Sequence, residues 1–354
     1  MDPSYTTPST LPLKDSLNTW SNVSTNNSTL KCPESEAWDW LFTMQPVFMT
    51  AVCVLGMIGN VFVLVVFCFH KKPCTVAEIY LSNLAAADLL LLSCLPFWVA
   101  NWVAGFHWPF GDLMCRLVNA GIGMNTYSSI YFLVLVSGDR YVALVHAMSH
   151  GHLRRPRYAK LSCLAAWGLG VLLVVPQLHY RTLSHVYNVT ACVLRFPSLK
   201  AQLASDVVIV LLGFVVPVSA ISYFTYRIIR ALHGQRMERF NAENTERKAT
   251  FLVLAVLMAF LLCWVPFHLH TIVDILWHLG AVSGCPLEHA LDICGQLFTY
   301  LALSNSLLNP ILYVIVGKNF RKKVRELLKQ ISLGRRTAGS TKSQLSTLKT
   351  FASN

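Results

Sequence analysis

Long runs of apolar residues, separated by short polar segments, dominate the pattern of this chain. Seven of them are long enough to cross the hydrocarbon core of a bilayer as a helix, which takes about 20 apolar residues. They cover residues 46–69, 79–102, 113–144, 158–178, 204–231, 249–277 and 289–316. A segment inside a bilayer must satisfy its backbone hydrogen bonds internally. The pattern therefore predicts an all-α membrane protein built as a bundle of seven transmembrane helices.

The apolar runs divide the chain into three parts. Residues 1–45 are rich in Ser, Thr, Asn and Pro and contain no signal-peptide pattern, so we expect an extracellular segment. Residues 46–316 form the transmembrane domain. Residues 317–354 should form a short amphipathic eighth helix on the cytoplasmic surface, followed by a disordered tail. The apolar positions of this eighth helix recur at helical spacing among Lys and Arg residues: Phe320, Val324, Leu327, Leu328 and Ile331.

Basic residues between the runs predict the orientation of the chain. The segments after the first, third and fifth runs carry Lys and Arg, whereas residues 278–289 carry none. Because cytoplasmic loops are enriched in these residues, we expect a multi-pass plasma-membrane protein with its N-terminus outside. Asn-x-Ser/Thr sequons, which would be glycosylated outside the cell, agree with this orientation. They occur at Asn22, Asn26, Asn27 and Asn188.

Composition and charge exclude other classes. The chain is 54% apolar with only 13% charged residues, and its net charge of +12 comes from short segments between apolar runs. No solvated basic face of the kind that binds nucleic acid results from this arrangement. No motif brings a nucleophile, a base and a third group together, so we expect no enzyme. Six of the eleven cysteines lie in or at the ends of apolar runs, where we expect packing thiols: Cys53, Cys68, Cys94, Cys163, Cys263 and Cys294.

A charged residue, Asp88, lies inside the second run, where a charge costs a few kcal/mol. Other polar residues share helix faces at a spacing of four and could converge on it. These are Asn125 and Ser129 in the third run and Asn305 and Asn309 in the seventh, and Asn60 of the first run could join them. Their oxygens would suit a sodium ion, the one metal that the sequence suggests. A hydrogen-bond network through buried water is the alternative, and the sequence leaves both open.

Three motifs are candidates for a conformational switch. Asp139-Arg140-Tyr141 ends the third run, and Glu246 precedes the sixth. A pair between Arg140 and Glu246 would hold two helices together, although a plain helix-end charge cluster is an alternative. Prolines in Cys263-Trp264-Val265-Pro266 and Asn309-Pro310-Ile311-Leu312-Tyr313 each remove a backbone hydrogen bond and permit a bend. Bendable helices are switch candidates, but a proline can also be a tolerated kink.

The order of these motifs resembles that of the rhodopsin-like G-protein-coupled receptors along all seven helices. The matching positions also include Asn60, Leu84-Ala85-Ala86-Ala87-Asp88, Trp167 and Pro217. The resemblance implies an agonist pocket open to the outside and outward movement of the sixth helix when a G protein binds. It also implies a disulfide between Cys115 and Cys192.

Two ligand classes are excluded on chemical grounds. The seventh run has no lysine for a retinal Schiff base. Ile122 stands where receptors for small amines have an aspartate, so a protonated amine would lack its counter-ion. Instead, Asp274 and Asp292 are expected near the outer mouth of the bundle. Two carboxylates there would attract a basic peptide, although either alone could be a solvated acid at a helix end.

Local segments resemble the bradykinin receptors, and those of type 2 more than those of type 1. They are Ala77-Glu78-Ile79-Tyr80-Leu81, Cys94-Leu95-Pro96-Phe97-Trp98, Trp108-Pro109-Phe110-Gly111, Met124-Asn125-Thr126-Tyr127-Ser128-Ser129 and Asn188-Val189-Thr190-Ala191-Cys192. The resemblance implies that Asp274 and Asp292 receive the N-terminal arginine of a kinin, and that Cys32 and Cys285 form a second outer disulfide. Gly123 replaces a lysine of type-1 receptors and should leave room for a C-terminal arginine.

The same resemblance implies further contacts and partners. Arg181 would meet the peptide carboxylate, and pocket residues would include Trp98, Trp108, Ile122, Trp264, Phe267 and Gln296. A Gq-class G protein, with the Gi class as a further candidate, would contact Arg140 and Met148 and raise cytosolic calcium. Receptor kinases would phosphorylate Ser and Thr residues of the tail such as Ser340, Thr341, Ser346 and Thr347, and arrestin would then bind the phosphorylated tail. An angiotensin-like or chemokine-like receptor is the alternative, and an ion channel or transporter centred on Asp88 is the alternative from another class.

Overall fold

Seven membrane-spanning helices form the protein. The structure, a computed structural model, describes residues 37–69, 73–145, 155–186, 189–234, 243–330 and 332. Its elements are α2 (Ala37–Cys68), α3 (Val76–Val103), α4 (Gly111–Val145), α5 (Pro156–Tyr180), β1 (Arg181–Val186), β2 (Val189–Leu194), α6 (Leu199–Val210), the π-helical turn η1 (Leu211–Val215), α7 (Val216–Gly234), α8 (Glu243–His278) and α9 (Cys285–Ile315). The segments α6, η1 and α7 make one span, so the described residues contain seven helices long and apolar enough to cross a membrane. The predicted fold class is confirmed.

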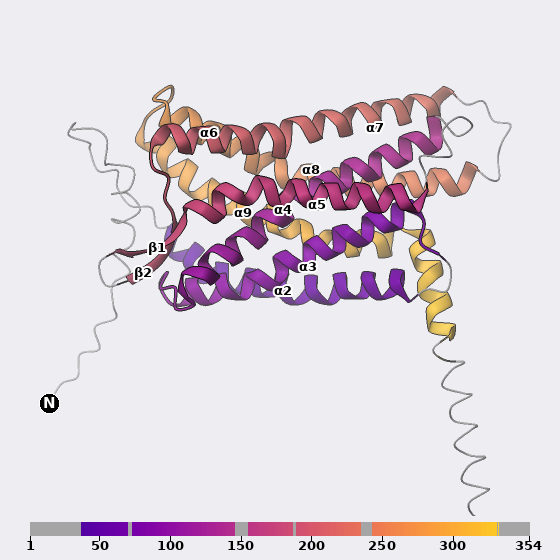
Figure 1. Cartoon of the computed structure of the whole chain (residues 1–354), viewed down its shortest axis with the longest axis horizontal. Helices are drawn as coiled ribbons and strands as arrows, with labels where there is room; N and C mark the ends of the chain where they lie inside the picture. Colours follow the sequence, from indigo (N-terminus) through magenta and orange to yellow (C-terminus); the bar gives the residue numbers. More distant parts are fainter. Residues whose placement is uncertain are drawn as a thin grey trace, which may run out of the picture.

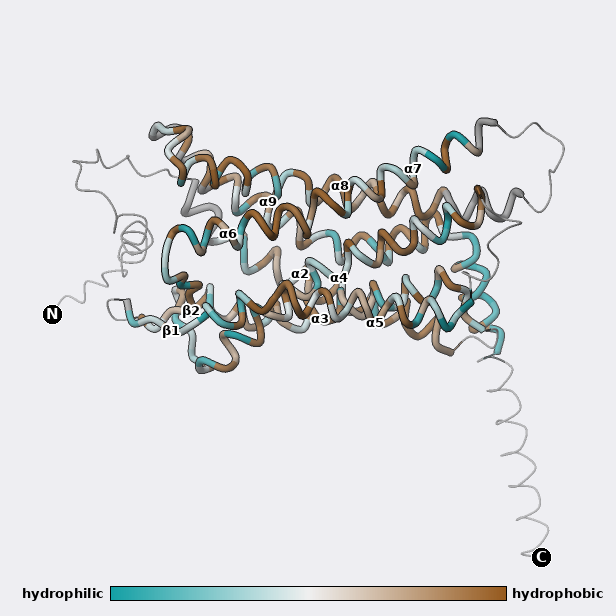
Figure 2. The backbone as a smooth tube through the Cα atoms, turned by 45° about the horizontal axis from the view of Figure 1, so that its top comes forward, coloured by the Kyte–Doolittle hydropathy of each residue, from teal (hydrophilic) through white to brown (hydrophobic). Residues whose placement is uncertain are grey.

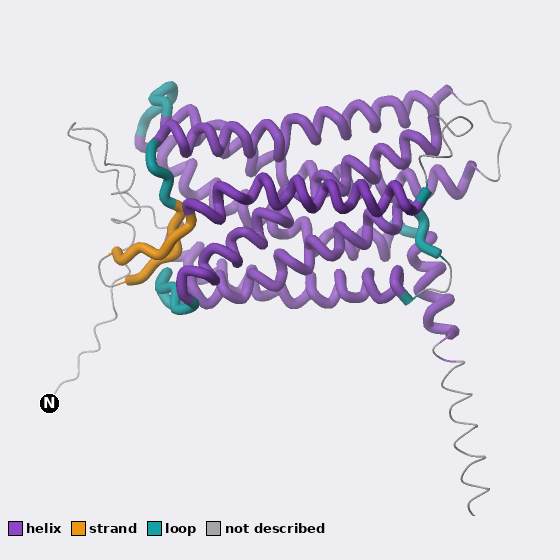
Figure 3. Tube along the Cα trace, in the orientation of Figure 1, coloured by secondary structure: helices purple, strands orange, loops and turns teal. Residues whose placement is uncertain are grey.

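The spans lie side by side in a single bundle, as Figure 1 and Figure 3 show. The hairpin of β1 and β2 lies at one end of this bundle, which we call the hairpin end. Residues 318–330 form a further helix that runs across the opposite end, confirming the predicted eighth helix. In Figure 2 the spans are mostly hydrophobic, whereas this last helix is largely hydrophilic.

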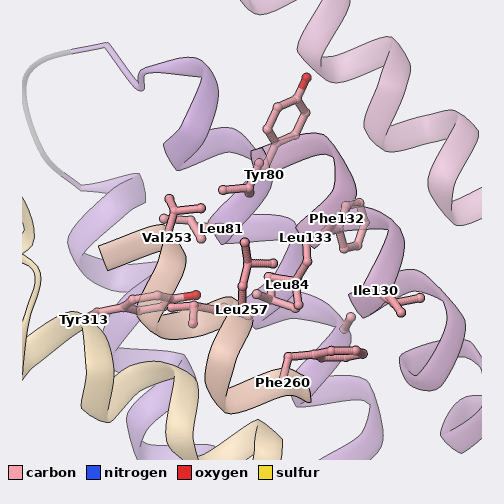
Figure 4. Packing of buried hydrophobic residues seen from close by; sticks show 14 of the residues in the cluster. Tyr80, Leu81, Leu84, Ile130, Phe132, Leu133, Val253, Leu257, Phe260 and Tyr313 are labelled. Carbon is pink, nitrogen blue, oxygen red and sulfur yellow. The ribbon is translucent and has the colours of Figure 1, made fainter. Parts of the chain in front are cut away.

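Buried apolar side chains fill the bundle between α3, α4, α8 and α9 (Figure 4). Leu84, Ile130 and Phe132 are fully buried there, and Tyr313 of α9 lies beside Leu257 of α8. Large apolar side chains on the outer faces remain more than half exposed, for example Ile58, Leu172 and Leu262. An outer surface of this kind suits contact with lipid.

Several helices extend beyond the apolar runs that predicted them. The first begins at Ala37 rather than near 46, and the sixth at Glu243 rather than near 249. Hydropathy marks only the part of a helix that lies in the hydrocarbon core, whereas backbone hydrogen bonding continues into polar sequence. The domain boundary expected at residue 46 therefore lies within α2.

The fifth span contains a wide turn that the sequence analysis did not predict. Pro217 has no backbone N–H, and the π-helical turn η1 lies just before it. The carbonyl oxygen of Leu212 in this turn accepts a hydrogen bond from the Tyr131 hydroxyl of α4 at 2.7 Å. The turn is thus stabilised by a side chain from a neighbouring helix.

A disulfide ties the hairpin to α4. Strands β1 and β2 pair antiparallel, with Leu183 opposite Cys192. The Cys192–Cys115 disulfide confirms the pairing that the family resemblance implied. Its neighbour Asn119 donates to the Cys192 sulfur at 3.4 Å. The hairpin itself was not predicted, because its two strands are short and its pairing depends on contacts with α4.

The helix of residues 318–330 is held by protein contacts. Phe320 is buried, with its ring 5.5 Å from that of Phe67. Arg321 donates to the carbonyl of Ile315 at the end of α9 at 2.7 Å. Lys323 pairs with Glu78 of α3 at 2.8 Å, so this lysine joins the helix to the bundle.

Candidate functional site

Asp88 lies at the centre of a buried polar network between α3, α4 and α9. Its carboxylate accepts hydrogen bonds from Asn125 at 3.0 Å, from Ser306 at 2.8 Å and from Asn309 at 2.9 Å. Asn125 also donates to Ser129 at 3.1 Å. All five side chains are buried, and the network joins three helices. Away from water its hydrogen bonds are stronger, and losing one leaves a costly unpaired polar group.

Two members of the predicted cluster differ from the expectation. Asn305 has no hydrogen bond to Asp88, and its neighbour Ser306 occupies that place. Both residues lie about one turn before Asn309, so spacing alone could not choose between them. Asn60 instead donates to the backbone carbonyls of Gly56 and Ser306.

Acceptor oxygens without a hydrogen-bond partner surround this network. Within the described part of the chain they belong to Asn60, Asn305 and Asn309. Buried acceptors of this kind suit either ordered water or a hard cation. These oxygens therefore fit both a sodium ion and a network through buried water, the two possibilities that the sequence left open.

Two neighbouring residues of the charged motif at the end of α4 form an ion pair with each other. Arg140 donates to the Asp139 carboxylate from Nη2 at 2.5 Å and from Nε at 3.1 Å. Both side chains are buried. Tyr141 faces α7, with its ring 5.4 Å from Phe224 and 5.7 Å from the guanidinium of Arg227. The arginine of this motif is thus engaged within its own helix.

Aromatic rings surround the proline of α8. Trp264 is buried, lies 5.8 Å from the rings of Phe260 and Phe267, and is part of the core. His268 is also buried and stacks on Phe214 of η1 at 4.4 Å. A bend at Pro266 would shift these rings together.

The hairpin end of the bundle carries the acids that the sequence singled out. Asp274 is near the end of α8, its side chain is 40% exposed, and His278 lies 3.6 Å from it. Asp206 of α6 is close enough to both for their charges to interact. Since α9 begins at this end, the backbone of Asp292 lies here too. Asp274 and the backbone of Asp292 therefore lie at the same end of the bundle.

Trp108 is not placed as a pocket wall. It is only 2% exposed, its ring nitrogen donates to the Gly111 carbonyl at 3.0 Å, and its backbone N–H donates to Thr190 of β2. The ring packs beside Trp98 at 6.3 Å. Trp108 therefore anchors the hairpin, whereas Trp98 is half-buried. Sequence alone could not separate an aromatic anchor from an aromatic wall.

The open space expected beside Gly123 is filled. A Cβ atom added to Gly123 would lie 2.6 Å from Gln177 Oε1 and 2.9 Å from Val174. Both belong to α5, so this position lies at a helix contact. Ile122 is half-buried and packs against two apolar clusters, one formed by α2 and α3 and the other around Trp108 and Cys115. A ligand group could use the room near Gly123 only if the Gln177 side chain moved.

Arg181 begins β1 directly after α5. Burial lowers the pKa of its guanidinium to about 10, so it remains positively charged near neutral pH. Its Nε has no hydrogen-bond partner among the described residues. A half-buried cation whose Nε–H has no described acceptor could receive an anionic group. Phe267 and Gln296 are half-buried on α8 and α9.

Some predicted residues lie outside what the structure describes. This holds for Cys32, Asn22, Asn26, Asn27, Asn188, Met148 and the four tail residues Ser340, Thr341, Ser346 and Thr347. It also holds for the side chains of Glu246, Cys285 and Asp292. The Arg140–Glu246 pair, the second disulfide and the contacts of Asp292 stay predictions. The six cysteines expected as packing thiols are all free.

The sequence analysis missed one ion pair beside the mouth. Arg116 and Asp112, at the start of α4, lie 2.7 Å apart. Arg116 also donates to the Leu178 carbonyl at the end of α5 at 3.1 Å, and Asp112 accepts from the Leu183 backbone N–H at 3.2 Å. Their spacing of four residues would have revealed the pair, but not its contacts with the hairpin.

Comparisons with known proteins agree with this architecture. Residues 59–313 match the model of the 7 transmembrane receptor (rhodopsin family). The chain is 51% identical to the B2 bradykinin receptor of Mus musculus, over 84% of this chain and 76% of that receptor. Identity to the B2 bradykinin receptor of Homo sapiens is 49%, over 84% and 77%. Identity to the B1 bradykinin receptor of Macaca mulatta is 40%, over 90% and 92%.

These matches extend along nearly the whole transmembrane bundle and include the Asp88 network and both proline motifs. They point to a receptor and not to an enzyme. The chain therefore belongs to the rhodopsin family of seven-transmembrane receptors and, within it, to the bradykinin receptors.

Proposed function

We propose that this protein is a plasma-membrane receptor for a basic, kinin-like peptide, with its hairpin end outside the cell. The observation that carries the proposal is about 50% identity to B2 bradykinin receptors over most of the chain. Coupling to a Gq-class G protein and calcium release, with later phosphorylation and arrestin binding, are part of the proposal.

The chemistry of the hairpin end supports a basic ligand. Asp274 has a 40% exposed side chain, and its described ionic partner is His278 at 3.6 Å. Asp206 adds a second carboxylate nearby. The guanidinium of a basic ligand could donate charge-assisted hydrogen bonds to these carboxylates, and such bonds are stronger than those between neutral groups. Arg181, on the hairpin, could meet the carboxylate of the same peptide.

A binding assay tests the proposal directly. Cells that express the receptor should bind a labelled kinin and answer it with a calcium transient, and the intact peptide should be more potent than its C-terminal des-arginine form. Angiotensin-like and chemokine ligands serve as comparison ligands. Absence of both binding and calcium release at micromolar kinin would reject the kinin assignment.

We further propose that a sodium ion can occupy the network at Asp88. The buried carboxylate and the unpartnered amide oxygens around it support this role. We propose that the ion fits the resting arrangement of the helices better than the activated one. It would then stabilise the resting state and reduce agonist affinity.

Replacing Asp88 with Asn should abolish the dependence of agonist affinity on sodium. In the wild type, exchanging sodium chloride for a large organic cation should raise agonist affinity several-fold, because the ion no longer competes with the activated state. The Asp88→Asn receptor should show the same affinity in both salts. An unchanged sodium effect in this variant would place the ion elsewhere.

A further inference from the structure

His270 of α8 is inserted into a notch on α9. Its Nε2 lies 2.8 Å from the carbonyl oxygen of Leu291. A Cβ atom added to Gly295 would lie 2.8 Å from Nε2 and 2.9 Å from Cε1 of the same ring. Contacts below 3.0 Å are essentially absent for real Cβ atoms, so any other residue at this position would displace the imidazole from where it lies.

The notch occupies one face of α9. Leu291, Gly295 and Phe298 are spaced as i, i+4 and i+7, which places them on the same side of a helix. The Phe298 ring completes the wall, with its centroid 6.5 Å from that of His270 and the two planes at 75°. His270 is therefore held by a backbone acceptor, a missing side chain and an aromatic edge.

The contact requires a proton on Nε2 of the His270 imidazole. A carbonyl oxygen can only accept a hydrogen bond, so Nε2 must carry the proton. Protonation of Nδ1 would leave this donor in place. The contact therefore persists whether the ring is neutral or charged.

The notch lies next to Asp274, which the proposed function uses, and next to the backbone of Asp292, the other acid that the family resemblance assigns to the ligand's arginine. Asp274 follows His270 by four residues, one turn further along α8. Asp292 directly follows Leu291, whose carbonyl accepts the hydrogen bond. A shift of α8 relative to α9 at this contact would change the distance from Asp274 to the backbone of Asp292.

We infer that His270 and Gly295 form a joint that sets the distance between Asp274 and Asp292, and that His270 is a positioning residue for recognition of the ligand's basic amino end. This inference rests on the proposed function. The joint would matter for a ligand that contacts both acids together, and much less for a ligand without that basic group.

Substitutions at the two positions separate the hydrogen bond from the fit. His270→Phe keeps a ring of similar size but removes the donor, and we expect roughly a ten-fold loss of affinity for a kinin with an amino-terminal arginine, about 1.4 kcal/mol. His270→Gln can place an amide N–H where Nε2 lies and should recover most of the affinity. Gly295→Ala should cause a loss similar to that of His270→Phe, because the ring is pushed out of the notch.

A double-mutant cycle tests whether the two residues act as a unit. Once His270→Ala has emptied the notch, adding Gly295→Ala should cost almost nothing further. Gly168→Ala on α5 is the matched control, because a Cβ atom there meets no other atom within 4 Å. It should bind like the wild type.

Two results would overturn the inference. One is additive loss from His270→Ala and Gly295→Ala. The other is an equal loss for a kinin from which the amino-terminal arginine has been removed, since that would indicate general damage to the fold. If the wild type binds no kinin at all, the proposed function fails separately. The cycle is then read from the thermal unfolding temperature of the purified receptor, where additivity would again reject the joint.

Discussion

Replacing Asp274 with Asn should lower the potency of an intact kinin about thirty-fold or more while surface expression stays at the wild-type level. Loss of one partner from a charge pair that becomes covered on binding costs about 2 kcal/mol or more. The carboxylate is partly exposed before binding, so the fold does not depend on it. Dose–response curves for calcium release, with cell-surface labelling of the receptor, measure both quantities.

Two controls make the Asp274 result specific. A kinin without its amino-terminal arginine should be weak on the wild type and lose little more on Asp274→Asn. Asp112→Asn alters another carboxylate at the same end, which is already bonded to Arg116 at 2.7 Å, and should change potency by less than about three-fold. Equal potency of the intact peptide on the wild type and on Asp274→Asn would remove this residue from the ligand site.

Replacing Cys115 with Ser should reduce surface expression and ligand binding about ten-fold or more. The Cys115–Cys192 disulfide closes a loop with a sequence separation of 77, and loss of a disulfide typically costs about 2–4 kcal/mol. Without it, the hairpin would be joined to α4 mainly through Asp112 and Asn119. Saturation binding on intact cells counts the folded receptors.

Free and paired cysteines provide the comparison. Cys294→Ser changes a half-buried free thiol and should leave expression near the wild-type level. The double variant Cys115→Ser/Cys192→Ser should be no worse than either single variant, because one missing partner already removes the bond. A Cys115→Ser receptor with full expression and affinity would show that the hairpin folds without this link.

Hydropathy and motif order predicted the seven spans, the eighth helix and the family, because these features repeat a local pattern along the chain. The same information placed Asp88, Asn125 and Asn309 correctly in one network. It could not choose Ser306 over Asn305, since that choice depends on how α9 is rotated against α3. Helical spacing gives a face, but not the direction in which that face points.

Contacts between helices account for the other differences. Gly123 was interpreted as free space, yet the Gln177 side chain from α5 fills it. Trp108 was interpreted as a pocket wall, yet it is buried beneath β2. Neither outcome follows from composition or periodicity. Both depend on neighbours more than 50 positions away along the chain.

The wide turn η1 rotates the two halves of the fifth span, α6 and α7, relative to each other. A π-helical turn holds one residue more than an α-helical turn, and each residue of an α-helix advances by about 100° around its axis. The extra residue rotates α6 relative to α7 about their common axis. As a result Asp206 on α6 can lie near α8 while Phe224 on α7 packs against Tyr141. Receptors that share α7 but lack the extra residue would present a different strip of α6 to the same ligand.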